Sequence, residues 1–176
     1  MCRSRLLGAT ASYPRSVAPL ALAYALAGRT TDALAVLEQV EGNFIVRAEA
    51  YLIVGDVEEA HRLLQRGLEN ARHRNTRGQE ARALWLLGEI AMHADPPDHA
   101  PAEAHYQQAL TLAEALGMRP LVAHCHHGLG RLYCQTGRSE QARAELFAAI
   151  ALYRAMAMTF WLPQAEAALA QVEGRP

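Results

Sequence analysis

The sequence contains no lysine, and all 17 of its basic residues are arginine. Without lysine this chain cannot form the glycine-rich phosphate-binding loop that ends in Lys-Ser or Lys-Thr, so nucleotide hydrolysis at a site of that type is excluded. We interpret the arginine preference as a coding bias of the kind found in GC-rich bacterial DNA.

Neither sign of charge predominates, and the formal net charge is −1 at pH 7. A chain this close to neutrality has no overall field that attracts nucleic acid or an anionic membrane. No apolar run reaches the length of a membrane-spanning helix, and residues 1–11 lack the apolar core of a signal peptide. The three cysteines, Cys2, Cys125 and Cys134, lack the spacing of a disulfide framework, which favours a reducing compartment such as the cytoplasm.

Aromatic residues are few, at 6%, whereas hydrophobic residues reach 51% and many of them are alanine. This composition favours closely packed helices over a sheet. Apolar residues recur at helical spacing between glycine- and proline-containing turns, which predicts an all-α chain of nine helices. We expect a flexible segment at 1–13 and a single helical domain at 14–176, with helical hairpins at 14–41, 43–74, 76–117 and 119–157 and a capping helix at 159–173.

Two short patterns predict where helices begin. Asp56 and Glu59 resemble a capping box, in which the first side chain accepts a hydrogen bond from the backbone N–H three residues later. Thr76 and Gln79 form a second pattern of this type. Thr159 is the expected N-cap of the last helix.

The stretch from Leu121 to Tyr153 has the most informative spacing. A turn at Gly137 separates two predicted helices, and small residues at Gly130 and Ala142 allow these helices to approach closely. Larger residues fill the space between them. The pattern consists of Leu129, Gly130 and Tyr133 before the turn and Ala142, Leu146 and Ala149 after it, and tyrosine recurs four residues before the turn glycines 28, 55 and 137.

This spacing resembles the tetratricopeptide repeat. The resemblance implies a right-handed superhelix of four antiparallel hairpins and a capping helix. Residues 117–125, 128–133 and 159–167 are similar to the C-terminal repeat region of bacterial multidomain ATPases with adenylate-cyclase or LuxR-type output domains. That similarity implies a cytoplasmic protein-interaction scaffold or regulatory sensor arm, and not an enzyme.

In the family that the chain resembles, the first helix of each hairpin lines a concave groove. Alignment on Gly88 and on Gly130 then places a mixed aromatic, basic and imidazole surface in the groove, which suits a peptide or a partner protein. Trp85 is the strongest candidate, because Leu84, Leu87 and Ala91 already supply the core at that helix. The predicted groove residues are Arg82, Trp85, Glu89, Met92 and His93 on one helix, and His124, His127, Arg131, Cys134 and Gln135 on another.

The run His124-Cys125-His126-His127 offers an alternative function. His124 and His127 share a helix face and could bind a divalent metal, but a metal site needs three or four ligands and no carboxylate lies beside them at helical spacing. A metal-responsive or small-ligand sensor that uses these histidines is the alternative function. We expect no cofactor, no resident metal and no catalytic residue. We also expect His124, His127, Arg131 and Gln135 to form an outward-facing row.

The first predicted helix is apolar on nearly every position between Val17 and Ala27. A terminal helix of a repeat array normally presents a polar outer face. This segment is therefore predicted to pack against a second copy of the chain or against another domain.

Overall fold

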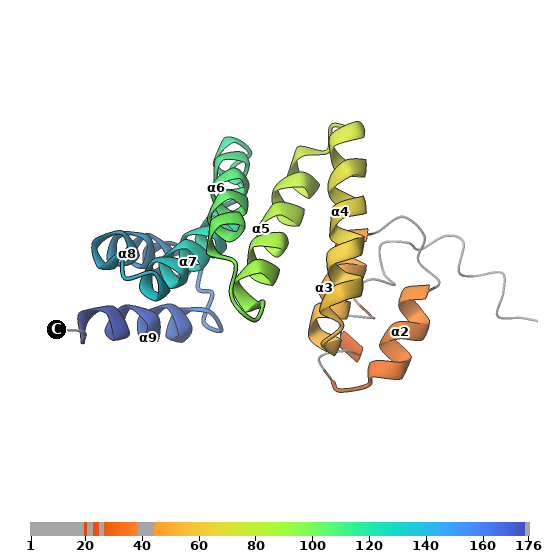
Figure 1. Ribbon diagram of the computed structural model, residues 1–176, viewed down its shortest axis with the longest axis horizontal. Helices are drawn as coiled ribbons and strands as arrows, with labels where there is room; N and C mark the ends of the chain where they lie inside the picture. The colour runs from red at the N-terminus through yellow and green to blue at the C-terminus, as the bar shows by residue number, and fades with distance from the viewer. Residues whose placement is uncertain (1–19, 21–22, 25–26, 39–43, 175–176) are drawn as a thin grey trace, which may run out of the picture. The chain divides into compact units, whose positions relative to one another are not determined.

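The computed structural model describes residues 20, 23–24, 27–38 and 44–174, and all regular secondary structure within them is α-helical. The all-α prediction is confirmed. Most of the predicted helix at 14–27 lies outside the described residues, as does any surface that it forms. The labelled helices are α2 (Thr30–Glu38), α3 (Phe44–Val54), α4 (Val57–His73), α5 (Arg77–His93), α6 (His99–Ala115), α7 (Arg119–Gln135), α8 (Ser139–Ala155) and α9 (Leu162–Glu173) (Figure 1).

Contacts divide the chain into two compact units, Met1–Gly67 and Leu68–Pro176, with the boundary inside α4. In the first unit, α2 packs against α3, and the start of α3 packs against α4. A Cβ atom added to Gly67 would lie 3.1 Å from Cβ of Phe44, and the guanidinium of Arg66 lies 5.0 Å from the centre of the Phe44 ring. The absence of a side chain at Gly67 is therefore what permits this approach.

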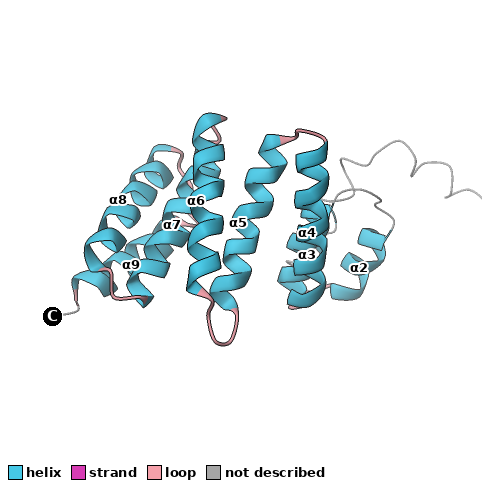
Figure 2. Cartoon of the chain, turned by 45° about the horizontal axis from the view of Figure 1, so that its top comes forward, coloured by secondary structure: helices cyan, strands magenta, loops and turns pink. Residues whose placement is uncertain are grey.

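In the second unit each helix from α5 to α9 packs against the next one along the chain. α7 also contacts both α5 and α9, so these three helices form one layer, while α6 and α8 lie in the other (Figure 2). Short connections join the helices as antiparallel hairpins. Side chains of successive hairpins can therefore meet on α5, α7 and α9, and the candidate site lies on this layer.

The turns are closed by residues in the left-handed backbone region. Gly137 has a φ of 75°, and the N–H of Arg138 donates to the carbonyl of Tyr133 at 2.9 Å, a bond that satisfies a free carbonyl at the end of α7. Ala157 takes the same role after α8 with a φ of 54°, although its Cβ disfavours that conformation. The turn spacing noted in the sequence thus has a direct backbone cause.

The predicted helix starts have mixed outcomes. The capping bond at α4 is confirmed, because the N–H of Glu59 donates to Oδ1 of Asp56 at 3.1 Å. Thr76 is the N-cap of α5, but its hydroxyl makes no capping bond and donates instead to the carbonyl of Ala71 at 3.3 Å. The N-cap of α9 is Trp161, so the assignment of Thr159 as this cap is wrong.

The close approach predicted at Gly130 is confirmed. A Cβ atom at this position would lie 2.6 Å from Cγ of Leu146, inside van der Waals contact. Leu146 and Ala142 are both fully buried on α8. The prominence of these residues in the sequence therefore reflects helix packing.

Candidate functional site

A continuous row of rings crosses the layer formed by α5, α7 and the start of α9. Trp85 of α5 stacks on His124 of α7, with ring centroids 5.2 Å apart and an interplanar angle of 27°. Trp161 meets His124 edge-on at 4.8 Å, and Phe160 meets Trp161 edge-on at 5.1 Å. We call Trp85, His124, Phe160 and Trp161 the aromatic face.

The aromatic face is partly open to solvent. Phe160 is 72% exposed, whereas the other three rings are half-buried. Stacked and edge-on rings hold one another in place, since these geometries are the favourable arrangements of aromatic pairs. The face therefore presents a large, rigid apolar surface with one strongly exposed edge.

Trp85 connects the aromatic face to the core. Its ring packs against buried residues of two core clusters, so it is not the purely outward residue that the sequence suggested. Its Nε1 atom is buried and has no hydrogen-bond partner in the part of the chain that the structure describes. Among the described residues, the indole N–H of Trp85 thus lacks the acceptor that a buried indole normally finds.

Two histidines of α7 share one hydroxyl of α8. The hydroxyl of Tyr153 lies 2.9 Å from Nδ1 of His124 and 3.5 Å from Nδ1 of His127, the second distance being at the limit of a hydrogen bond. A hydroxyl carries one hydrogen and can accept two hydrogen bonds, so it donates to at most one of the two rings. When both contacts are hydrogen bonds, at least one of the two imidazoles therefore carries its proton on Nδ1.

Burial keeps these imidazoles uncharged. It lowers the pKa of His124 to about 4, an effect that the carboxylate of Glu89 opposes and the nearby charge of Arg82 reinforces. Burial likewise lowers the pKa of His127 to about 4, with Arg131 adding to the shift and Glu89 opposing it. At neutral pH the aromatic face consequently has no charge of its own.

Glu89 joins three helices beside the aromatic face. Its Oε1 accepts a hydrogen bond from the hydroxyl of Tyr106 at 2.7 Å, and its Oε2 lies 3.3 Å from Nη1 of Arg131. Tyr106 belongs to α6 and is fully buried, so the carboxylate fixes α5 against α6 and α7. The charge of Glu89 is balanced locally by Arg131.

The remaining predicted groove residues have different surroundings. Arg82 and His93 are exposed on α5, and Nδ1 of His93 lies 2.8 Å from the carbonyl of Glu89 in its own helix. Gln135 is exposed, and its Oε1 lies 3.1 Å from Nε2 of His99. The structure therefore brings Trp85 together with His124 and Glu89 together with Arg131, whereas His93 and Gln135 bond elsewhere.

Two exposure predictions are wrong. His127 is only 6% exposed and Met92 only 3%, so neither faces outward. His127 turns inward because its ring packs edge-on against Tyr153, at 6.0 Å between centroids. Met92 belongs to the core cluster that also contains Tyr106.

Four residues of the site were missed from the sequence, and one of them is the exposed Phe160. Tyr153 and Trp161 complete the surroundings of His124, and Tyr106 anchors Glu89. Two glycines could have indicated where the ring of Tyr106 lies, because they have no side chain. A Cβ atom at Gly88 would lie 2.7 Å from this ring, and one at Gly128 would lie 2.6 Å from it. A second glycine on α7 beside Gly130 indicated an additional close approach.

The histidine run does not assemble a set of metal ligands with its neighbours. No group of three or more His, Cys, Asp and Glu side chains is placed to hold a metal ion within the described ranges. His126 instead bonds Glu145 of α8, with Nδ1 and Oε2 2.6 Å apart. All three histidines of the run thus have partners on α8.

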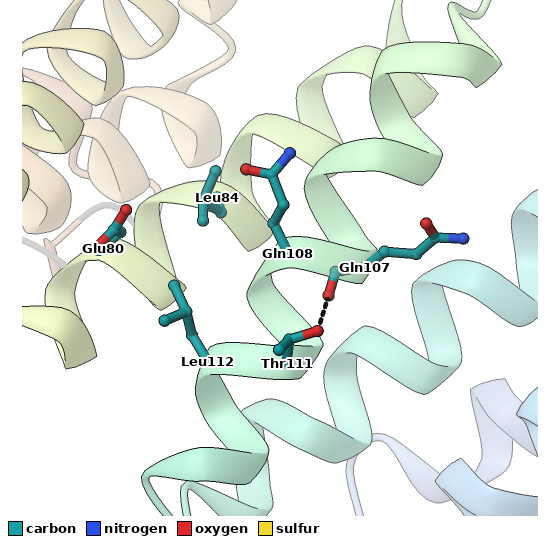
Figure 3. A pocket seen from close by; sticks show the side chains of 6 residues that line it. All are labelled: Glu80, Leu84, Gln107, Gln108, Thr111 and Leu112. Atoms are coloured by element: carbon teal, nitrogen blue, oxygen red, sulfur yellow. Dashed lines mark hydrogen bonds between the residues drawn. The ribbon is translucent and has the colours of Figure 1, made fainter.

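A separate cavity of about 370 Å³ lies between α5 and α6 (Figure 3). Its titratable lining residue, Glu80, already pairs with Arg72 at 2.9 Å, and the hydroxyl of Thr111 donates to the carbonyl of Gln107 at 2.9 Å. Its lining consists of Glu80, Leu84, Gln107, Gln108, Thr111 and Leu112. None of the predicted groove residues belongs to it.

Two family models, each described as Tetratricopeptide repeat, match the chain. One covers residues 80–155, and the other covers residues 14–39 and 44–66. The chain therefore carries tetratricopeptide repeats, in agreement with the spacing in its sequence and with the antiparallel helical hairpins. No curated protein matches it. Among the described helices, none combines the length and the hydropathy needed to cross a membrane.

Proposed function

We propose that this repeat-containing chain is a non-catalytic interaction scaffold that binds a peptide or a partner protein on the aromatic face. Tetratricopeptide repeats generally mediate binding between proteins, so the repeats support the broad function. The row of four rings supports the location, because large rings that are already fixed in place lose little conformational freedom when they bind. The strong exposure of Phe160 is the single observation that most favours this site.

The partner contacts the aromatic face mainly through an apolar side chain. Arg131 already neutralises Glu89, and His124 is uncharged at neutral pH. A charged group placed against this surface would lose hydration without finding an opposite charge. The unpaired indole N–H of Trp85 supplies one polar contact, which a backbone carbonyl of the partner accepts after a small movement of the ring.

Arg82, which is exposed three residues before Trp85 on α5, lies at the edge of the binding surface and adjusts its specificity. Edge charges affect the rate of association more than they affect the final affinity. We assign the central role to Trp85 and His124, with Glu89 and Arg131 holding the helices that carry them. His127 supports the surface from below, since it is buried.

The wider role that we propose is a regulatory sensor arm in the bacterial cytoplasm. This role rests on the similarity of residues 117–125, 128–133 and 159–167 to the repeat region of multidomain ATPase regulators. The apolar segment from Val17 to Ala27 would then pack against a neighbouring domain or a second copy of the chain. The metal-responsive alternative has less support, because Nδ1 of both His124 and His127 faces Tyr153.

A displayed library of random peptides, selected on the purified chain at pH 7, tests the proposal. We expect the enriched peptides to contain aromatic or aliphatic residues and to lose about tenfold in affinity or more when Phe160→Ala or Trp85→Ala is introduced. Phe147→Ala is the matched control, because Phe147 is also an exposed phenylalanine, at 51%, but lies on α8. Circular dichroism checks that each variant is folded.

Two outcomes would contradict the proposed site. One is enrichment of peptides whose affinity is unchanged in both Phe160→Ala and Trp85→Ala. The other is an equal loss of affinity in Phe147→Ala, which would move the binding surface to the opposite layer of the hairpins.

A further inference from the structure

We propose that the aromatic face is acid-sensitive, because His124 and His127 share the Tyr153 hydroxyl beneath it and protonation of either ring opens the contacts between α7, α8 and the two tryptophans. The release of a bound partner by acid rests on the proposed function. The opening itself is a property of the chain alone and can be measured without a partner.

The surroundings of His124 disfavour a positive charge on its ring. Trp85 covers one side of its ring, Trp161 approaches it edge-on, and Nδ1 faces Tyr153. A cation needs water or a carboxylate when it forms in such a place. The hydroxyl of Tyr153 is a neutral acceptor that His127 also uses, so it cannot serve as a counter-ion for either ring.

The charged groups around the pair offset an added positive charge only in part. Glu89 of α5 is the acidic group that acts on both rings, but it already accepts hydrogen bonds from Tyr106 and Arg131. Arg82 of α5 opposes protonation of His124, and Arg131 of α7 opposes protonation of His127.

Three carboxylates on the other neighbouring helices are also engaged. Each of the three already has a basic partner, and one of them also accepts from a tyrosine hydroxyl. These pairs are Glu103 of α6 with Tyr133 and Arg138, Glu145 of α8 with His126, and Glu166 of α9 with Arg154.

The direction of the pH effect follows from this arrangement. A histidine whose pKa falls from 6.5 in the unfolded chain to about 4 in the folded chain binds its proton preferentially when unfolded. The stability of the folded chain is therefore unaffected by this histidine above pH 6.5 and decreases as the pH falls from 6.5 toward 4. Over this range each such histidine lowers the folding equilibrium constant about tenfold for every unit by which the pH falls.

The two tryptophans are internal reporters of this event. They are the only tryptophans in the sequence, and both rings contact His124. A positive charge that forms 5.2 Å from the Trp85 ring centroid changes the surroundings of that indole directly. Tryptophan emission is therefore specific for the state of the aromatic face.

The test is a titration of tryptophan emission in the full chain from pH 7.5 to pH 3.5. We expect a reversible change centred well below pH 6.5, close to the pKa of about 4 that burial gives His124. His124→Gln should reduce the change to the part that His127 causes, because glutamine keeps a polar side chain at this position but cannot titrate. His126→Gln is the matched control and should follow the unaltered chain, since His126 bonds Glu145 away from the tryptophans.

Histidine-ring NMR on the unaltered chain gives the same information without a variant. Two rings should titrate with midpoints well below pH 6.5 and should show that they are coupled to each other. Constant emission over the whole range, a midpoint near pH 6.5, or an unchanged curve in His124→Gln would each overturn the proposal.

A selected peptide extends the test to partner release. The ratio of its affinities at pH 7 and pH 3.5 should exceed about tenfold for the unaltered chain, because both rings with a pKa of about 4 are then mostly protonated, and it should be smaller for His127→Gln. If the peptide library yields no ligand, the proposed function fails, and the emission titration still decides whether the face is acid-sensitive. If a ligand binds equally at both pH values, acid release is wrong while the binding site is retained.

Discussion

Two tyrosines of the second unit use the same chemistry in different ways. Tyr106 and Tyr133 each donate a hydrogen bond to a glutamate that also accepts one from an arginine. The ring of Tyr106 is enclosed by α5 and α7, where a Cβ atom at Gly88 or Gly128 would lie less than 3 Å from it.

The ring of Tyr133 belongs to the core and has an additional cover from its own local sequence. The guanidinium of Arg138, just after the turn, lies 4.0 Å from the ring centre. Tyr24 and Arg29 repeat this arrangement at the same spacing in the first unit, at 4.4 Å. Tyr133 therefore takes part of its cover from a short stretch of chain, whereas Tyr106 is enclosed by neighbouring helices alone.

Removal of the rings should show the largest difference between the two. We expect Tyr106→Ala to lower the free energy of unfolding of the second unit by about 4 kcal/mol, because it leaves a cavity between three helices. Tyr133→Ala should lower it less, since the side chain of Arg138 can settle into part of the space. Urea unfolding followed by tryptophan emission measures both, and equal losses would contradict the comparison.

Removal of the hydroxyls is the next test. Tyr106→Phe should lower the free energy of unfolding by about 2 kcal/mol, because a hydrogen bond to a partly buried carboxylate is lost. Tyr133→Phe should lower the free energy of unfolding by about 1 kcal/mol. The loss is smaller because Glu103 still accepts a hydrogen bond from Arg138 at 2.8 Å. The contact that remains to Glu89 in Tyr106→Phe, with Arg131, is longer, at 3.3 Å. The same urea experiment applies, and a larger loss for Tyr133→Phe would be inconsistent with this ordering.

The close approach at Gly128 predicts a change of sign. Gly128→Ala should destabilise the chain by about 1.5 kcal/mol, because the new methyl group meets the ring of Tyr106. In the Tyr106→Ala background the same substitution should stabilise by up to about 1 kcal/mol, since alanine favours helix more than glycine does. A double-mutant cycle in urea measures this reversal, and additive effects would mean that the ring does not restrict position 128.

The smallest effects are expected at the turns. Ala157→Gly should stabilise the chain by about 0.5 kcal/mol, because glycine adopts a φ of 54° without strain. The gain is small because glycine also increases the conformational freedom of the unfolded chain. Gly137→Ala should destabilise it by about 1 kcal/mol for the opposite reason. Thermal unfolding of the two variants side by side tests the pair, and a shift in the same direction for both would contradict the backbone explanation.

Much of the fold could be predicted from local patterns. Gly130 and Ala142 identified the contact between α7 and α8, and Asp56 identified the start of α4, because these features depend on neighbours along the chain. Thr159 was a wrong start for α9, since a good capping residue does not determine which turn of the backbone becomes helical. α9 begins instead at Leu162, after Trp161, with Pro163 in its first turn.

The candidate site was only partly predictable. The alignment of repeats brought Trp85 and His124 to the same layer, and their stacking agrees with that expectation. It could not give the rotation of α7 about its own axis, which turns His127 toward Tyr153.

The sequence by itself determined that this chain is helical, that its turns need a left-handed residue, and that small residues separate its helices. These properties follow from backbone conformation and side-chain size, which act over a few residues. The tertiary structure alone decided that two histidines share one hydroxyl, that Tyr106 fits against Gly88 and Gly128, and that four rings form one surface. Such contacts join helices distant in the sequence, and their energy depends on packing and burial that no local pattern contains.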